Sequence, residues 1–428
     1  MAVSARALTE ALAAIAGADR LVTDPARLAA CAVDGRVPAW IARPARVEDV
    51  SPLLRLATEE RLAVAPRGSG SALGLGNPPQ RLDGVLDLSG LAAVVDYEPA
   101  DLTATVQCGI SLGQVQARLG AHGQFLPLDP LGGPSRTLGG VLATNGSGPL
   151  RFRYGTPRDL LLGVRFVQAD GTVTWGGARV VKSVTGYDVP KLMVGSLGTL
   201  AVLVEATLRL HPLPEGEATW VVSFPAAESA AGLLAAILDS CLQPNRLEIL
   251  SGGGKAAVVV SFGSVPDAVR AQGESLAALA RREGVEAATA APDFWSRPPA
   301  LPADAPVLLK ISALPSDVAA LCGEIQRLGA SLGLPAEIVG EAGNGALHVA
   351  LKGALRGAEW EAKVIAPLRE RVAPIGGSVV VERAPLPVKE RLDVWGPVEP
   401  GALRIMKRLK AEFDPLGVLN PGRFVERI

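Results

Sequence analysis

The chain has 428 residues, of which 48% are hydrophobic and 20% are charged. This composition indicates a globular protein rather than a disordered one, and the length suffices for two or three domains. The 42 basic and 43 acidic side chains leave a net charge of -1, which argues against a basic surface for nucleic acid.

The cysteines and the hydropathy pattern restrict the cofactor class and the location. The four cysteines are widely separated and form no C-x-x-C pair, so we expect no iron–sulfur cluster on this chain. Arg6 and Glu10 interrupt the apolar residues of the N-terminus, and no stretch has the length of a membrane-spanning helix. We therefore expect a cytoplasmic protein that is peripheral to the inner membrane only through a complex.

The first half of the chain predicts a mixture of helices and strands. Residues 1–40 are expected to be helical with one break, and a helix should follow and end at Glu60. Ser111 and Gln114 form a capping-box pattern, which predicts a helix over 112–119. Two strand-like runs flank Asp170-Gly171, which predicts a hairpin.

Two glycine-rich segments stand out within this half. Residues 66–74 (P-R-G-S-G-S-A-L-G) follow an apolar run, and residues 137–148 (T-L-G-G-V-L-A-T-N-G-S-G) lie about seventy residues further on. Both place small residues where a backbone turns tightly and exposes N–H groups to an anion. The first segment lacks the third glycine of G-x-G-x-x-G, and no P-loop motif occurs. Two such loops indicate one large phosphate-bearing cofactor held from two sides.

The region after residue 213 predicts a second domain with an internal repeat. Strands over 219–224, 246–250 and 256–262 alternate with helices over 226–240 and 266–283, which gives the order β-α-β-β-α. The same order returns with strands over 306–312, 336–341 and 346–352 and helices over 315–333 and 357–372. A helix over 400–412 should then return the chain to the first domain.

The order of the motifs resembles one flavoprotein superfamily. The glycine-rich segments are followed by R-Y-G-T-P-R-D at 153–159, G-S-L-G-T-L at 195–200 and F-D-P-L-G-V-L-N-P-G-R at 413–423. This series is similar to the vanillyl-alcohol oxidase / p-cresol methylhydroxylase (PCMH) superfamily, in its glycolate and D-lactate dehydrogenase branch. The resemblance implies an α+β fold with a two-subdomain PCMH-type FAD-binding domain and a ferredoxin-like cap. The implied boundaries are an N-terminal extension 1–40, the FAD domain 41–213, the cap 214–395 and a returning segment 396–428.

The resemblance also implies FAD as the cofactor and indicates its binding residues. Ser71 stands where some members carry a histidine that bonds the flavin, so we expect noncovalent FAD. By the family pattern, Gly198 and Val202 face the adenine side and Asn420 lies near the isoalloxazine. The full set of predicted cofactor-binding residues is Pro66, Arg67, Gly68, Ser69, Gly70, Ser71, Pro130, Thr137, Gly139, Gly140, Thr144, Asn145, Ser147, Arg153, Tyr154, Gly198, Val202 and Asn420.

The expected substrate site of the cap departs from the family pattern. Related D-2-hydroxy-acid enzymes carry H-x-G-D-G-N-x-H and later E-H-G, which hold a divalent metal, whereas this chain reads E-A-G-N-G-A-L-H at 341–348 and E-R-A at 382–384. We favour a site that has lost its metal, and keep Glu341, His348 and Glu382 as weak metal candidates. His348 is the candidate base, and Arg297 and Lys310 are candidates to bind a substrate carboxylate.

These departures, together with Leu197 where catalytic chains read glutamate, resemble the second flavin subunit of bacterial glycolate oxidase, the E subunit. This implies an accessory flavin subunit that works with a catalytic flavin chain and an iron–sulfur chain in 2-hydroxy-acid oxidation. Two alternatives stay open: a stand-alone FAD-dependent D-lactate or 2-hydroxy-acid dehydrogenase, and a flavin-free assembly scaffold.

Overall fold

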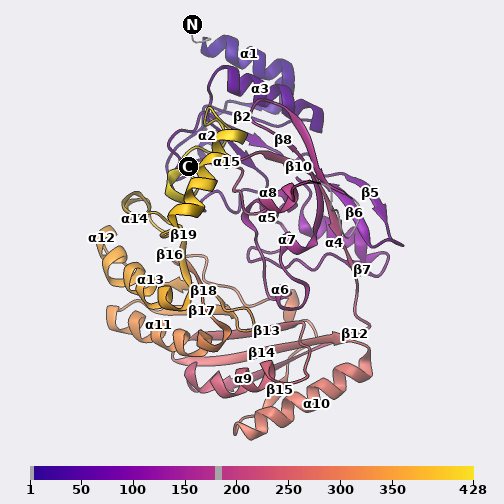
Figure 1. Cartoon of the computed structure of the whole chain (residues 1–428), viewed down its shortest axis with the longest axis vertical. Helices are drawn as coiled ribbons and strands as arrows, with labels where there is room; N and C mark the ends of the chain where they lie inside the picture. Colours follow the sequence, from indigo (N-terminus) through magenta and orange to yellow (C-terminus); the bar gives the residue numbers. More distant parts are fainter. Residues whose placement is uncertain (1–3, 179–185) are drawn as a thin grey trace. The chain divides into compact units, whose positions relative to one another are not determined.

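The computed structural model describes residues 4–178 and 186–428, so the first three residues of the predicted extension lie outside it. Packing of the backbone divides the chain into two units (Figure 1). The first unit comprises 1–147, 156–213 and 397–428. The second comprises 148–155 and 214–396. Both units combine helices with sheets, which confirms the predicted α+β class. Within the described ranges, no helix is long and apolar enough to cross a membrane.

The first sheet of the first unit has four short strands. Its order is β1-β2-β4-β3, with β2, β4 and β3 parallel and β1 antiparallel to β2. The strands are β1 (Leu21–Val22), β2 (Trp40–Ala42), β3 (Val64–Arg67) and β4 (Gly84–Asp87). Because β2 and β4 are buried along their whole length, their apolar runs show no alternation.

Helices α1 (Ala5–Ala16), α2 (Pro25–Ala29) and α3 (Val50–Glu59) belong to the same part of the unit. The expectation of an N-terminal region that is helical with a single break was wrong in one respect, because β1 interrupts it and pairs with β2. Two residues carry too little alternation to be recognised as a strand before the partner strand is known.

The second sheet of this unit is antiparallel and has the order β5-β6-β10-β8-β9. Its strands are β5 (Val94–Glu98), β6 (Thr103–Gln107), β8 (Leu161–Val167), β9 (Val173–Gly177) and β10 (Val202–Arg209). The predicted hairpin is confirmed, since β8 and β9 pair across a turn in which Gly171 has a φ of 84°. The helices near it are α4 (Leu112–Gly120), α5 (Leu138–Thr144), α7 (Pro157–Leu160), α8 (Val189–Met193) and α15 (Pro400–Phe413). The capping box of α4 is confirmed at Ser111 and Gln114.

The second unit is built on an eight-stranded antiparallel sheet of order β15-β12-β14-β13-β17-β18-β16-β19. The predicted twofold β-α-β-β-α pattern is confirmed, and the two halves join where β13 pairs with β17. The strands are β12 (Gly216–Phe224), β13 (Arg246–Gly252), β14 (Lys255–Ser264), β15 (Ala287–Thr289), β16 (Val307–Ser312), β17 (Ala336–Glu341), β18 (Ala346–Leu351) and β19 (Ser378–Arg383). The longer helices are α9 (Ala231–Leu238), α10 (Pro266–Arg282), α11 (Val318–Leu332) and α13 (Ala366–Val372).

The two faces of this sheet differ in character. Alternate strand residues such as Ile249, Val349 and Leu309 form one buried core with residues of α9, α10, α11 and α13, which lie on one side of the sheet (Figure 1). The intervening residues include Glu248, Lys310 and His348, and they point to the opposite face because side chains alternate along a strand. The short helix α6 (Arg151–Tyr154) lies against β13.

Candidate functional site

The first glycine-rich segment follows β3 and forms one wall of a groove in the first unit. The space within the groove amounts to about 820 Å³, counting the part continuous with solvent. Its lining combines the loop 66–73, residues around the start of α5, the loop before β10 and the C-terminal segment. The predicted residues that line it are Pro66, Arg67, Gly68, Ser69, Gly70, Ser71, Thr137, Gly139, Gly140, Thr144, Gly198 and Asn420.

Close backbone approach explains the glycines at two of these positions. A Cβ atom on Gly68 would lie 1.9 Å from Oγ1 of Thr137, and one on Gly139 would lie 2.9 Å from Cβ of Cys108. Gly70 has a φ of 83°, a conformation that side chains of L-residues disfavour. The two glycine-rich segments therefore meet at Gly68 and Thr137, where a larger residue would push them apart, and a larger residue at Gly139 would push α5 away from Cys108.

Arg67 supplies positive charge to the groove. Its Nη1 donates to Oδ2 of Asp87 at 2.9 Å, and Asp87 also accepts from Nε of Arg43 at 3.1 Å. The buried Nε of Arg67 has no hydrogen-bond partner within the described chain, and a Cβ on Gly70 would lie 2.8 Å from it. Asp87 thus holds the guanidinium of Arg67 beside the glycine loop and leaves its Nε available to donate to a ligand.

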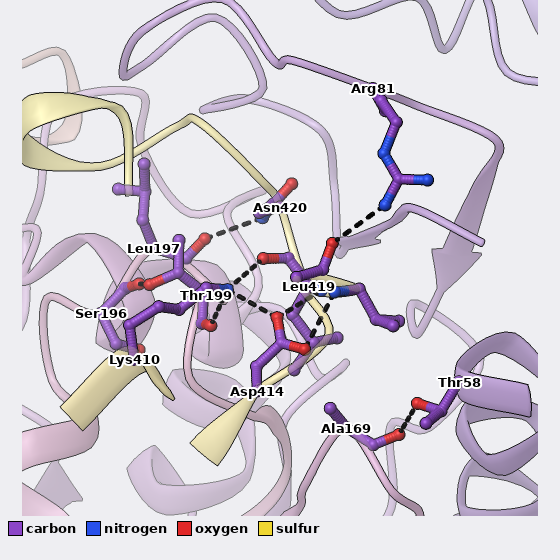
Figure 2. A network of polar contacts seen from close by, with 12 residues as sticks. Thr58, Arg81, Ala169, Ser196, Leu197, Thr199, Lys410, Asp414, Leu419 and Asn420 are labelled. Atoms are coloured by element: carbon purple, nitrogen blue, oxygen red, sulfur yellow. Dashed lines mark hydrogen bonds and ion pairs between the residues drawn. The ribbon is translucent and has the colours of Figure 1, made fainter. Parts of the chain in front are cut away.

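Side chains of α15 and the C-terminal segment donate to backbone carbonyls of the loop 195–200, which lines the groove. Nδ2 of Asn420 donates to the carbonyl of Leu197 at 2.8 Å, as Figure 2 shows. Nζ of Lys410 donates to the carbonyls of Thr199 and Leu419 at 2.8 and 2.9 Å and to Oδ2 of Asp414 at 2.6 Å. These contacts tie the loop 195–200 to the end of the chain.

Arg423 is a groove residue that the sequence analysis missed. Its side chain is buried, donates to the carbonyls of Leu73 and Leu75, and pairs with Asp34 at 3.2 Å. Burial lowers its pKa to about 10. It is the R of N-P-G-R, so the motif was visible, but its partner carbonyls are some 350 positions away in the sequence and no local pattern indicates them.

The groove fits the phosphate-bearing cofactor that the sequence predicts. Its lining includes Gly68, Gly139 and Gly140 of the two glycine-rich segments, and Arg67 offers a donor without a partner in the described chain. Outside the lining, Oδ1 of Asn145 at the end of α5 is also buried without a hydrogen-bond partner in the described part of the chain. Cys108 lies in the lining as a small buried residue, and burial raises the pKa of its thiol.

Other predicted cofactor residues lie outside this lining. Pro130, Asn145 and Ser147 lie close in the sequence to residues that line the groove but are not among them. Val202 is fully buried in β10. Arg153 and Tyr154 belong to the second unit, where the Tyr154 hydroxyl accepts from Nδ2 of Asn245 at 3.0 Å. Their roles toward a cofactor stay predictions.

A polar cluster lies on the face of the second unit's sheet opposite the packed helices, and its members Glu341 and His348 are buried. Nδ1 of His348 is 3.0 Å from Oε2 of Glu382, and Lys310 faces His348 across the β16–β18 pair. Glu341 is buried, with Nη1 of Arg151 at 3.6 Å. Burial raises the pKa of Glu341, and the charges of Arg151, His348 and Lys310 only partly oppose this.

This cluster brings together most of the cap residues that the sequence singled out, but not as a metal site. No group of three or more His, Cys, Asp or Glu side chains in residues 4–178 and 186–428 is arranged to hold a metal ion. Arg297 is exposed after a short turn, and no hydrogen bond or ion pair joins it to the cluster in the described structure. Arg151 was missed, because only the fold places helix α6 beside the sheet.

The sequence of the chain matches two family models and is similar to known flavoproteins. Residues 38–177 match the model of the FAD binding domain, and residues 394–424 match that of the C-terminal domain of FAD linked oxidases. The chain is 28% identical to the glycolate oxidase subunit GlcD of Bacillus subtilis, over 90% of this chain and 89% of that protein. It is 27% identical to the D-lactate dehydrogenase of Archaeoglobus fulgidus, over 91% of each.

Solved structures share the fold at lower identity. An alkyldihydroxyacetonephosphate synthase superposes with a TM-score of 0.77 at 18% identity, over 99% of this chain and 86% of that one. A p-cresol methylhydroxylase with bound substrate superposes with a TM-score of 0.76 at 16% identity, over 98% and 96%. These likenesses agree with the predicted PCMH-type architecture.

Proposed function

We propose, from the premise that this chain is an FAD-binding oxidoreductase related to glycolate oxidase and D-lactate dehydrogenase, that it is an accessory flavin subunit of a glycolate oxidase-type complex. Its partners would be a catalytic flavin chain and an iron–sulfur chain. The observation that carries this proposal is the charge pairing in the polar cluster of the second unit, which we call the cap cluster. In it, Arg151 faces Glu341 and Glu382 faces His348.

The groove of the first unit would hold FAD without a covalent bond. The amides of Gly68 to Ser71 and the free Nε of Arg67 would bind the pyrophosphate, and Asn420 and Gly198 would contact the rest of the cofactor. Bound FAD supplies a two-electron acceptor for hydride. The chain contributes binding, orientation and positive charge.

The cap supports an accessory role because its charges neutralise one another. Two carboxylates, Glu341 and Glu382, face the cations Arg151 and Lys310 and the imidazole of His348. A substrate carboxylate would have to compete with Glu341 for these cations. A site that binds a small hydroxy acid tightly would instead present unpaired positive charge.

An anaerobic absorbance titration of the purified chain, first with glycolate and then with D-lactate, tests the proposal. We expect a yellow protein whose flavin stays oxidised with either acid and is reduced by dithionite. The flavin should become reducible by glycolate once the catalytic flavin and iron–sulfur chains are added. Bleaching by either acid in the chain alone would contradict the accessory role, and a colourless protein would contradict flavin binding.

One observation favours a second candidate, a stand-alone 2-hydroxy-acid dehydrogenase. Glu382 contacts Nδ1 of His348, which orients the ring and leaves Nε2 to accept a hydroxyl proton. If the chain alone oxidises a hydroxy acid, His348→Ala should reduce turnover by about 100-fold or more while FAD stays bound. The flavin-free scaffold has no such support, since the FAD binding domain is matched and its glycine contacts are intact.

A further inference from the structure

A second hollow lies in the first unit, on the other side of the loop 195–200 from the flavin groove. The space within it amounts to about 1400 Å³, counting the part continuous with solvent, and it is bounded by α15 and by the segment that contains α8. We call it the α15 groove. Its apolar lining includes Ala402, Ile405, Met406 and Leu409 of α15 and Leu192 and Leu200 of the opposite wall.

Helix α15 presents an apolar stripe that the described chain covers only in part. Ala402, Ile405, Met406 and Leu409 follow the spacing i, i+3, i+4, i+7, so they lie along one side of the helix. None of the residues of α15 is buried, and Ile405 is 61% exposed. A stripe of this kind, recessed in a groove, is typical of a surface that receives another helix.

The charges around the stripe are mainly basic. Arg404, Lys407 and Arg408 are exposed on α15, against a single acid in the helix, Glu412. The opposite wall adds Arg158 and Lys191, the second of which pairs with Asp188 at 2.8 Å. No ion pair involves the three exposed cations of α15 within the described ranges, so their charge is available to a partner.

We propose that the α15 groove docks an amphipathic helix of a partner protein, with leucine-like side chains inserted between α15 and α8 and with acidic residues along its flanks. The apolar surface is concave, so a protruding helix can reach it, whereas a flat bilayer surface cannot fill it. Acidic flanks would pair with the cations of α15 and speed association.

The groove is also placed to affect the flavin site. Leu197 and Gly198 line the flavin groove, while Ser196, Thr199 and Leu200 line the α15 groove, so one loop forms both walls. Lys410 lines the α15 groove and donates to the carbonyl of Thr199 within that loop (Figure 2). Docking therefore shifts the environment of the bound flavin through a shared element. The inference rests on the proposed function only in assigning the partner to the same electron-transfer complex.

The test uses the full FAD-loaded chain and a fluorescein-labelled synthetic helical peptide with leucines at i, i+3, i+4 and i+7 and glutamates elsewhere. We expect saturable binding by fluorescence anisotropy with a small change in the flavin spectrum. Ile405→Glu should weaken binding by about tenfold or more, because a charge would enter the stripe. Leu238→Glu, at an exposed leucine that ends helix α9, is the matched control and should bind like the wild type.

The same peptide with lysine in place of glutamate tests the charge argument, and it should bind at least about tenfold more weakly. Three results would each overturn the inference. The two peptides could bind equally well, the Ile405→Glu variant could bind the acidic peptide as tightly as the wild type does, or the acidic peptide could show no saturable binding. Two further results would also overturn the inference. Flotation of the chain with phosphatidylglycerol vesicles that is lost in Ile405→Glu would assign the groove to lipid. A dimer in light scattering that is lost in the same variant would assign it to a second copy. The anaerobic titration of the mixed subunits tests the proposed function independently of peptide binding. If the flavin is reduced in the mixture but the peptide does not bind, only the proposed docking site is contradicted.

Discussion

The two candidate sites of this chain are built from different materials. The proposed flavin groove depends on close backbone contacts, since glycines are pressed against Thr137 and Cys108 and backbone carbonyls are bound by Lys410 and Asn420. The polar cluster of the second unit is made of side chains, Arg151, Glu341, His348 and Glu382, that come from separate elements. The first depends on conformation and the second on charge.

This difference determines how each site can change. A site that depends on backbone conformation is lost when a side chain is added or the conformation changes, so its glycines cannot be replaced by other residues. A side-chain site can exchange one polar group for another and keep the fold, because the β17–β18–β16–β19 pairs hold the strands in place whatever the outward-facing residues are. The residues of the polar cluster can therefore change while the glycine segments stay intact.

The largest expected effect comes from Lys410→Met, which removes the cation that ties the loop 195–200 to the C-terminal segment. Asp414 would keep two backbone donors, Val418 and Leu419, but would lose its buried counter-charge. We expect the free energy of unfolding to fall by about 3 kcal/mol, measured by urea denaturation. Flavin should also bind more weakly, since Thr199 and Leu419 lose a shared donor.

Lys407→Met, three residues earlier on the same helix and exposed, is the matched control for this change. It should alter the free energy of unfolding by less than about 0.5 kcal/mol. A loss for Lys410→Met no larger than that of the control would show that the network in Figure 2 does not stabilise the loop.

The next effect separates two glycines of the same loop. Gly68→Ala would place a methyl group against Thr137, whereas Gly74→Ala would meet no atom within 4 Å. We expect Gly68→Ala to weaken flavin binding by about 1–3 kcal/mol, roughly fivefold to 150-fold, and Gly74→Ala to leave it unchanged. Equilibrium binding of FAD to the apo-protein by flavin fluorescence measures both. Equal retention of FAD by the two variants would contradict the close approach of the two glycine segments.

The same contrast explains what the sequence could predict. The alternation of residues 214–372 predicted the repeated β-α-β-β-α order, and Ser111 with Gln114 predicted a helix start, because these signals are local. The glycine segments were recognisable because tight backbone turns require glycine. The partners of Arg423 and the position of Arg151 beside Glu341 depend on distant segments, so no local pattern indicated them.

The smallest effect concerns the pH dependence of the cap cluster. Burial raises the pKa of Glu341, so the folded chain binds this proton more tightly than the unfolded chain does. The stabilisation is then fully present below the ordinary pKa of 4.5 and is lost as the pH rises through the raised value. Glu341→Gln, which resembles the protonated form, should become more stable relative to the wild type as the pH increases from 4 to 8, by less than the two changes above.

Thermal unfolding over that pH range measures this difference, with Glu337→Gln as the control. Glu337 lies on the same strand but is partly exposed, so its variant should keep the pH dependence of the wild type. If Glu341→Gln instead loses stability relative to the wild type as the pH rises, the ion pair with Arg151 outweighs burial. The cap cluster would then be a stabilising salt-bridge network, and its charges would be even less available to a substrate.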